Sequence, residues 1–246
     1  MITVGIITDG KNNDRVSRIC NSIYDYRVQI IIIGGLECNI QDINSSITTS
    51  SGSVRRCRVI NFIPFDETER PGWISRKKNL VAQIAIYNNI CFVHDYVEFE
   101  DGWLDGFLKF EHDHDPLTCT NRVKNLDGSR YRDLAVIGND SWHDFNDGRR
   151  PFFSDPGRLL DYGVKITDDI ARWFYYSGAF FCAKKRVLLD VPIPEERLHG
   201  QGEDVLWCRQ LYFKYGAKAF SFNPHSSVRF LKQKESVQWQ NLPPIN

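Results

Sequence analysis

The chain has 246 residues, of which 42% are hydrophobic and 13% aromatic, and this composition suits one compact domain. Its 31 basic and 31 acidic residues cancel, so no net field favours nucleic acid or an acidic membrane as a partner. No apolar run reaches the roughly 18 residues of a transmembrane helix, and the first residues, MITVGIITDG, do not resemble a signal peptide. Seven scattered cysteines without CxxC spacing indicate reduced thiols. We therefore expect a protein of the cytoplasm or of its membrane surface.

Strands and helices alternate over the first hundred residues. The strands are short runs rich in Val and Ile, and the helices place their apolar residues at a spacing of three and four. This alternation predicts an α/β fold with a mainly parallel, doubly wound central sheet that carries helices on both faces. The predicted strands are 2–8, 28–35, 57–65 and 90–93, and the predicted helices are 14–26 and 73–89.

The fourth predicted strand ends in an unusual polar triplet, His94-Asp95-Tyr96. Open parallel sheets bind their ligands beyond the carboxyl ends of the strands. The fold class alone therefore makes His94, Asp95 and Tyr96 candidates for a binding site.

The second half of the chain is less regular. Residues 111–172 are expected to form a long, largely irregular segment, and such segments are usually functional or mobile. The acidic and histidine-rich sequence EHDHD (111–115) is interpreted as a solvated helix end rather than a metal site, and Arg149 and Arg150 as exposed loop residues. The predicted helices are 102–110, 184–190 and 199–216, and the predicted strands are 134–138, 173–183, 217–222 and 227–231.

Asp204 opens the predicted helix 199–216 and shares one helix face with Cys208, Leu211 and Tyr215. That mostly apolar face indicates an inward-pointing carboxylate, and a buried carboxylate needs a compensating reason. Asp204 could be a general base. Alternatively, Glu203 and Asp204 could simply complement the dipole of the helix N-terminus.

Two further features are ambiguous by themselves. Gly178 interrupts the aromatic strand YYSGAFF, and a strand glycine marks either the close approach of a ligand or another backbone, or a bulge or packing position. Arg76, Lys77 and Lys78 lie in the first turns of a helix, where cations oppose the dipole. They could face a bound anion or form a solvated basic surface.

The order of these motifs is more specific than any one of them. SRKKN (75–79), FVHDY (92–96), SGAFFCAKKR (177–186) and GEDVLW (202–207) together resemble the GT-A glycosyltransferases of the family 2 type. The resemblance covers roughly residues 1–110 and 173–230. It implies a GT-A fold in one domain, 1–246, with a nucleotide-sugar-binding half (1–110) and an acceptor-binding, catalytic half (111–246).

The resemblance also implies a reaction and its ligands. A sugar would pass from a nucleotide-sugar donor, with a UDP-sugar as the favoured guess, to a hydroxyl of a glycan or other acceptor. Asp204, beside Glu203, would be the general base of an inverting reaction, and Asp95 would bind Mn²⁺ or Mg²⁺. The donor would be bound by residues of four segments, namely Thr8, Asp9, Arg76, Asn79, His94, Asp95, Gly178 and Ala179.

This sequence departs from the family pattern at the acidic motif, because Asp95 stands alone between His94 and Tyr96. One carboxylate binds these hard cations weakly. A second ligand could come from His225. Alternatively, the enzyme could need no metal, and Arg76, Lys77 or Arg229 would neutralise the diphosphate.

Three other functions remain open on the sequence. The chain could be a non-catalytic GT-A-like module that binds a nucleotide or glycan, which the incomplete acid pair would favour. It could be a sugar-1-phosphate nucleotidyltransferase, although TDGKNNDR (8–15) is a poor phosphate loop. A retaining mechanism is equally compatible with the sequence.

Overall fold

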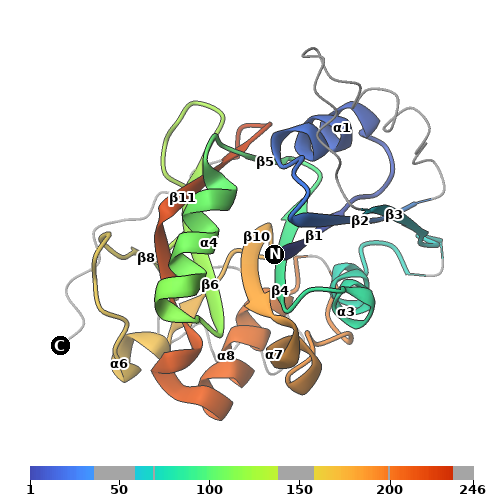
Figure 1. The fold of residues 1–246 in the computed structure, drawn as a ribbon. Coiled ribbons are helices and arrows are strands. Elements are labelled where there is room, and N and C mark those ends of the chain that lie inside the picture. Colours follow the sequence, from blue (N-terminus) through green and yellow to red (C-terminus); the bar gives the residue numbers. More distant parts are fainter. Residues whose placement is uncertain (36–58, 69, 138–157, 199, 235–246) are drawn as a thin grey trace.

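The structure is a computed structural model that describes residues 1–35, 59–68, 70–137, 158–198 and 200–234. An eight-stranded sheet forms its centre, with the strand order β3-β2-β1-β4-β10-β6-β11-β5 (Figure 1). Arg149 and Arg150 lie outside the described residues. Within these ranges, no helix is long and apolar enough to cross a membrane.

The first half of the sheet is parallel, as predicted. The strands β1, β2 and β4 are buried along their whole length, because their Val and Ile side chains are covered on both faces. Each pairs in parallel with its neighbour. The elements of this half are β1 (Ile2–Ile7), α1 (Asn13–Ser22), β2 (Val28–Gly34), β3 (Val59–Pro64), α3 (Ile74–Ile84) and β4 (Asn89–His94).

The second half of the sheet is mixed. Strand β10 (Phe180–Lys184) lies antiparallel between β4 and β6 (Thr118–Lys124). Strand β11 (Phe222–Phe230) runs parallel to β6, and β5 (Val97–Phe99) pairs with β11 at the edge. Both proposed halves of the chain thus contribute to one sheet. The division of the chain at residue 110 stays a prediction.

A second, small sheet and several helices complete the described fold. The small sheet has the order β8-β7-β9. The remaining elements are α4 (Trp103–His114), β7 (Ala135–Val136), β8 (Arg158–Leu159), α6 (Asp168–Ala171), β9 (Phe174–Tyr175), α7 (Lys185–Asp190), α8 (Glu203–Tyr215) and the 3₁₀ turn η1 (Gly216–Ala219).

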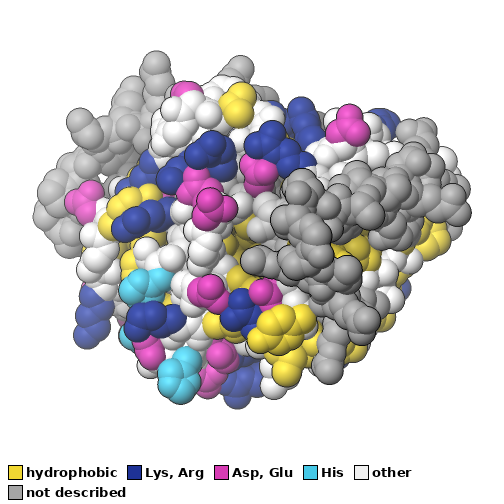
Figure 2. Space-filling view, turned by 45° about the horizontal axis from the view of Figure 1, so that its top comes forward, with side chains coloured by type: hydrophobic (Ala, Val, Ile, Leu, Met, Phe, Trp, Pro, Cys, Tyr) yellow, Lys and Arg dark blue, Asp and Glu magenta, His cyan; other side chains and the backbone are white. Residues whose placement is uncertain are grey.

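Two hydrophobic cores lie on opposite faces of the central sheet. One contains residues of α3, α7 and α8, and the other contains residues of α1 and α4. Strand β10 contributes to both, because Phe180 and Cys182 belong to one core and Phe181 and Ala183 to the other, as alternation along a strand requires. Helices on both faces are therefore confirmed. Acidic and basic side chains are interspersed on the face shown in Figure 2.

Several sequence predictions need correction. The predicted strand 173–183 is interrupted between β9 and β10 by a turn at Gly178, where Phe180 N donates to Ser177 O at 3.0 Å. The predicted strand 217–222 is mostly the turn η1, and the described part of 111–172 contains the unpredicted central strand β6. The EHDHD segment does end helix α4, with Lys184 Nζ paired to Glu111 at 2.8 Å and to Asp115 at 2.7 Å.

Candidate functional site

A pocket of about 600 Å³ lies at the carboxyl ends of β1 and β4, the position at which open α/β sheets bind ligands. Three of its sides come from the β1–α1 loop, the loop after β3 and the polar triplet after β4. The residues that line it include Thr8, Asp9, Lys11, Arg15, Glu67, Lys77, His94, Asp95, Tyr96 and Lys232.

Asp95 and Thr8 form the floor of this pocket. Thr8 Oγ1 donates to Asp95 Oδ2 at 2.9 Å, and Asp95 N donates to Ile7 O at 3.1 Å, which extends the β1–β4 pairing. Burial raises the pKa of Asp95, the Thr8 hydrogen bond opposes that rise, and the neighbouring Asp9 adds to it. The partly buried carboxylate is therefore placed where a cation would stabilise its charge.

The β1–α1 loop is shaped by its own side chains. Gly10 N donates to Thr8 Oγ1 at 3.0 Å, and Lys11 N donates to Asp9 Oδ1 at 3.0 Å. The loop also passes close to the end of β2, where a Cβ on Gly35 would lie 2.6 Å from Asp9 O. Only glycine at position 35 permits this approach.

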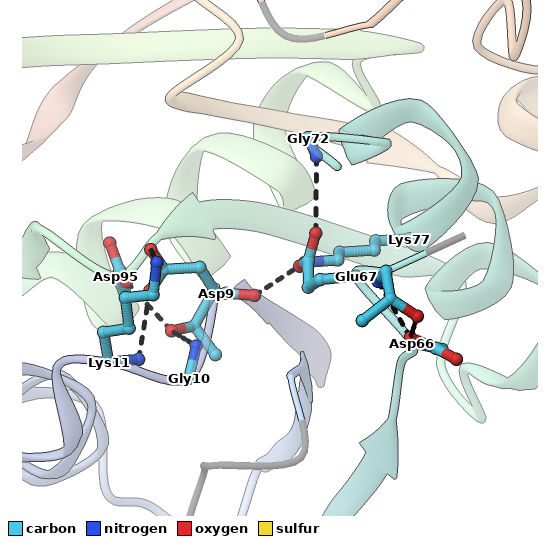
Figure 3. A network of polar contacts seen from close by, with 10 residues as sticks. Asp9, Gly10, Lys11, Asp66, Glu67, Gly72, Lys77 and Asp95 are labelled. Carbon is cyan, nitrogen blue, oxygen red and sulfur yellow. Dashed lines mark hydrogen bonds and ion pairs between the residues drawn. The ribbon is translucent and has the colours of Figure 1, made fainter. Parts of the chain in front are cut away.

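Lys77 is buried in the pocket wall and compensated by protein groups. Its ammonium donates to Thr8 O at 2.7 Å and pairs with Glu67, whose other oxygen accepts from Gly72 N at 3.3 Å. Figure 3 shows Lys77 reaching Glu67, whose carboxylate also meets Gly72. Lys77 therefore holds the β1–α1 loop on the N-terminal turn of α3.

A second cluster lies around Gly178. Asp204 Oδ2 accepts from Gly178 N at 2.7 Å, while Lys78 Nζ donates to Gly178 O at 2.8 Å. A Cβ on Gly178 would lie 3.1 Å from Asp204 Oδ2 and also 3.1 Å from Glu203 Oε1, so the two acids contact the turn at the point where it has no side chain. Side chains of the protein itself thus account for a glycine at this position, and a role of Gly178 in ligand binding stays a prediction.

Glu203 and Lys78 are the buried charged groups of this cluster. Burial and the neighbouring Asp204 together raise the pKa of Glu203 to about 7, although Lys78 opposes the shift. Burial lowers the pKa of Lys78, whereas Glu203 and Asp204 raise it. Asp204 itself is only partly buried, so of the two acids it is the one that faces outward.

The two clusters are adjacent. His94 N donates to Ala179 O at 3.1 Å, which joins the triplet after β4 to the turn before β10. Asp204 is bonded to Gly178, the preceding residue. The structure therefore brings Thr8, Asp9, His94 and Asp95 together in the pocket, and places Gly178, Ala179, Glu203 and Asp204 beside it.

Arg76 and Asn79 face away from this pocket. Asn79 Nδ2 donates to Ile193 O at 2.9 Å and to Glu195 Oε1 at 2.8 Å, and Arg76 Nη1 pairs with Glu195 Oε1 at 3.3 Å. These contacts hold the segment after α7 against α3. The structure thus assigns both residues contacts that support the fold, and it does not bring them to the pocket.

His225 lies near the start of β11, beside α4, where a Cβ on Gly106 would lie 2.3 Å from His225 O. The strand reaches the pocket six residues later, where Leu231 N donates to Tyr96 O at 2.8 Å. The pairing of β11 with β6 shifts its register between Asn223 and Ser227, and His225, which lies in this irregular stretch, is not among the residues that line the pocket. The structure therefore does not bring His225 and Asp95 together as ligands of one metal.

The residues around Asp95 do not fit a dedicated site for a divalent metal. Among the residues that the structure describes, no three His, Cys, Asp or Glu side chains gather as a metal site would require. Arg15 and Lys232 also lie close enough to influence Asp95. Mn²⁺ and Mg²⁺ prefer several oxygen ligands, whereas the carboxylates of Asp9, Asp66, Glu67 and Asp95, which all line this pocket, do not gather in a group of three.

Comparison with known proteins gives a clear result for the fold alone. No model of a known protein family matches the sequence, and no curated protein matches it. Solved structures do match. TarS of S. aureus aligns with a TM-score of 0.55 at 12% identity, over 93% of this chain and 36% of TarS. TarS 1-349 in complex with UDP aligns with a TM-score of 0.55 at 12% identity, over 93% of this chain and 60% of that one.

A third solved structure, GalNAc-T7 with UDP, GalNAc and Mn²⁺, aligns with a TM-score of 0.59 at 14% identity, over 99% of this chain and 45% of that one. This chain therefore spans 36% to 60% of the length of these three structures. The shared architecture confirms that the chain has the GT-A fold of glycosyltransferases, as the resemblance of its motifs implied.

Three basic residues near the pocket were not singled out by the sequence, namely Arg132, Lys232 and Lys234. Lys232 lines the pocket, and Lys234 and Arg132 lie beside it. Their sequence neighbourhoods, SRYRD and LKQKE, look like ordinary solvated segments. Only the pairing of β11 with β5 brings residues 231–234 back to Tyr96.

Proposed function

We propose that this chain transfers a sugar from a nucleoside-diphosphate donor, with UDP as the favoured nucleotide, to a hydroxyl group of a glycan or other acceptor. The observation that carries this proposal is the carboxylate of Asp204, bonded at 2.7 Å to the Gly178 turn beside the pocket at the ends of β1 and β4. The GT-A fold supports the reaction class. UDP in two of the similar solved structures supports the nucleotide.

In the proposed reaction, the acceptor oxygen attacks the anomeric carbon while the bond from that carbon to the diphosphate oxygen breaks. The bonding electrons leave with the nucleoside diphosphate, and Asp204 takes the proton of the acceptor hydroxyl. Attack on the face opposite the leaving group inverts the anomeric configuration. The Gly178 and Val205 amides each donate to Asp204, which fixes its carboxylate and leaves further lone pairs for the hydroxyl.

The pocket is proposed to hold the nucleoside and diphosphate, with Thr8, Asp9, His94 and Asp95 as its contacts. The Mn²⁺ in the GalNAc-T7 structure supports a divalent metal near Asp95, whereas the ligand set of this chain does not fit one. The metal therefore stays a prediction, and the reaction above uses only residues of this chain.

The direct test is to incubate the protein with a panel of nucleotide sugars, with and without Mn²⁺, and a mixture of glycan acceptors. We expect nucleoside diphosphate release that depends on the acceptor, measured by chromatography, and a glycosylated product of inverted configuration, measured by NMR. A product of retained configuration would remove Asp204 as the base. Absence of release, transfer and diphosphate binding under all conditions would refute the proposal.

A non-catalytic binding module is the second candidate, because only one carboxylate lies at the position of the family's acid pair. Such a module would bind a nucleoside diphosphate but release none from a nucleotide sugar. Calorimetric binding beside a turnover assay on the same preparation separates the two functions.

A further inference from the structure

Two lysines that follow β11 lie on the ring of Tyr96. Lys232 Nζ is 3.9 Å from the ring centroid, and Lys234 Nζ is 4.5 Å from it. Tyr96 itself is buried, with 7% of its surface exposed, and it immediately follows Asp95. Two ammonium groups are therefore held over one aromatic ring at the mouth of the pocket, where the ring attracts cations.

The chain positions this lysine pair through its backbone. Leu231 N donates to Tyr96 O at 2.8 Å. Asn125, which is fully buried, donates from Nδ2 to Lys234 O at 3.0 Å and accepts from Lys234 N at 2.9 Å. The segment that carries the lysines is thus fixed at both ends by hydrogen bonds to the buried residues Tyr96 and Asn125.

The charges around the pair are mostly of the same sign. Burial, together with the neighbouring Lys232 and Arg132, lowers the pKa of Lys234 to about 8, while Asp95 opposes the shift. Arg15 and Lys232 act on Asp95 from the pocket side. Among the described residues, no carboxylate lies within ion-pair distance of Lys232 or Lys234. Cationic side chains held close together repel one another unless an anion binds between them.

We propose that Lys232 and Lys234, supported by Arg15, bind the diphosphate of the nucleotide donor and neutralise it as it leaves, in the role that a metal has in related folds. This inference rests on the proposed function and gives it a binding site. Lysine is a common ligand of phosphate as a point charge. The leaving diphosphate gains the electron pair of the broken sugar–oxygen bond, and adjacent ammonium groups stabilise that charge.

This assignment also explains why Asp95 stands alone. The Asp95 carboxylate, which Lys232 and Arg15 influence, neutralises part of their charge and helps to keep them together. A second carboxylate within the triplet, as in the family's acid pair, would add to the negative charge that Asp9 already brings close to Asp95 and would weaken the attraction for a diphosphate. The cations that the sequence offered for this role are each paired with an acid of the protein, because Lys77 pairs with Glu67, Arg76 with Glu195, and Arg229 with Glu100.

The test is a calorimetric comparison of UDP, uridine and inorganic pyrophosphate in the presence of EDTA, using the wild type and the variants Lys232→Ala and Lys234→Ala. We expect UDP to bind without metal, and each substitution to weaken UDP and pyrophosphate by roughly ten- to a hundredfold. Uridine binding should not change, which shows that the pocket remains folded. Lys218→Ala, an exposed lysine of η1, is the matched control.

The possible results separate this inference from the proposed function. If UDP and pyrophosphate bind the single variants and a variant that combines Lys232→Ala with Lys234→Ala as tightly as the wild type, or bind the wild type only when Mn²⁺ is added, the lysine site is refuted even if sugar transfer occurs. If pyrophosphate binding depends on the lysines but no nucleotide sugar is turned over, the anion site stands and the proposed reaction fails.

Discussion

Asp204 is the residue on which the proposed chemistry depends most directly. Replacement by asparagine keeps the acceptor atom for the Gly178 amide and removes the base. We expect Asp204→Asn to lower turnover by about 10²- to 10⁴-fold while UDP binding stays within about twofold of the wild type. Initial rates and calorimetry measure the two quantities, and Asp161→Asn, an exposed aspartate, is the control. If Asp204→Asn instead loses UDP binding but keeps full turnover at saturating donor, Asp204 contacts the donor and is not the base.

Glu203 gives the protein a pH-dependent stability. Its folded pKa of about 7 lies above its ordinary value of 4.5. Folding therefore favours the protonated form, so this stabilisation is full below pH 4.5 and is lost as the pH rises through 7. We expect Glu203→Gln to gain up to roughly 3 kcal/mol relative to the wild type between pH 4.5 and pH 8. Urea unfolding at both pH values measures this, with the exposed Glu196→Gln as the control. A pH-independent difference would contradict it.

At the scale of secondary structure, one side chain connects the end of β6 to the segment after β11. Asn125 follows β6 and makes two hydrogen bonds to the backbone of Lys234. We expect Asn125→Ala to destabilise the fold by about 1–3 kcal/mol and to weaken UDP binding severalfold through displacement of Lys234. Binding of uridine should not change. Equal losses for UDP and uridine would indicate general unfolding rather than loss of lysine positioning.

The sequence predicts well those elements whose buried side chains are apolar. Strands β1, β2 and β4 are Val- and Ile-rich runs with complete burial, so hydrophobic pattern alone identifies them. The hydrophobic pattern does not predict strand β6, TCTNRVK, because several of its buried residues are polar. Thr118, for example, is buried with its hydroxyl bonded to Tyr176 and Ala219. Hydrophobic periodicity cannot detect a strand whose core contacts are hydrogen bonds.

The site was predictable to the extent that it depends on local motifs. The sequence placed Asp95 at a strand end and Asp204 at a helix start, and both positions are confirmed. It could not predict that Arg76 and Asn79 contact Glu195, because Glu195 lies far along the chain. Nor could it predict that His225 lies beside α4 rather than at the pocket. Lys232 and Lys234 reach Tyr96 only through long-range pairing, which no local pattern records.

On the scale of the whole molecule, the pocket is built from distant parts of the chain. Thr8 and Asp95 come from the first hundred residues, whereas Lys232 follows the last described strand. UDP binding should therefore protect backbone amides of 8–12 and of 231–234 together, since a ligand stabilises every element that it contacts. Hydrogen exchange with and without UDP measures this. Protection of 8–12 alone would place the diphosphate away from the lysines.

Strand β10 restricts how this protein can change during evolution. Its residues alternate between the two cores, and it begins directly after the turn that carries Gly178. Deletion of one residue within β10 would exchange the side chains of both cores and shift the turn by about 3 Å relative to β4. The turn that meets Asp204 would then lose its place beside His94. Within β10, substitutions of similar volume are therefore tolerated better than insertions or deletions.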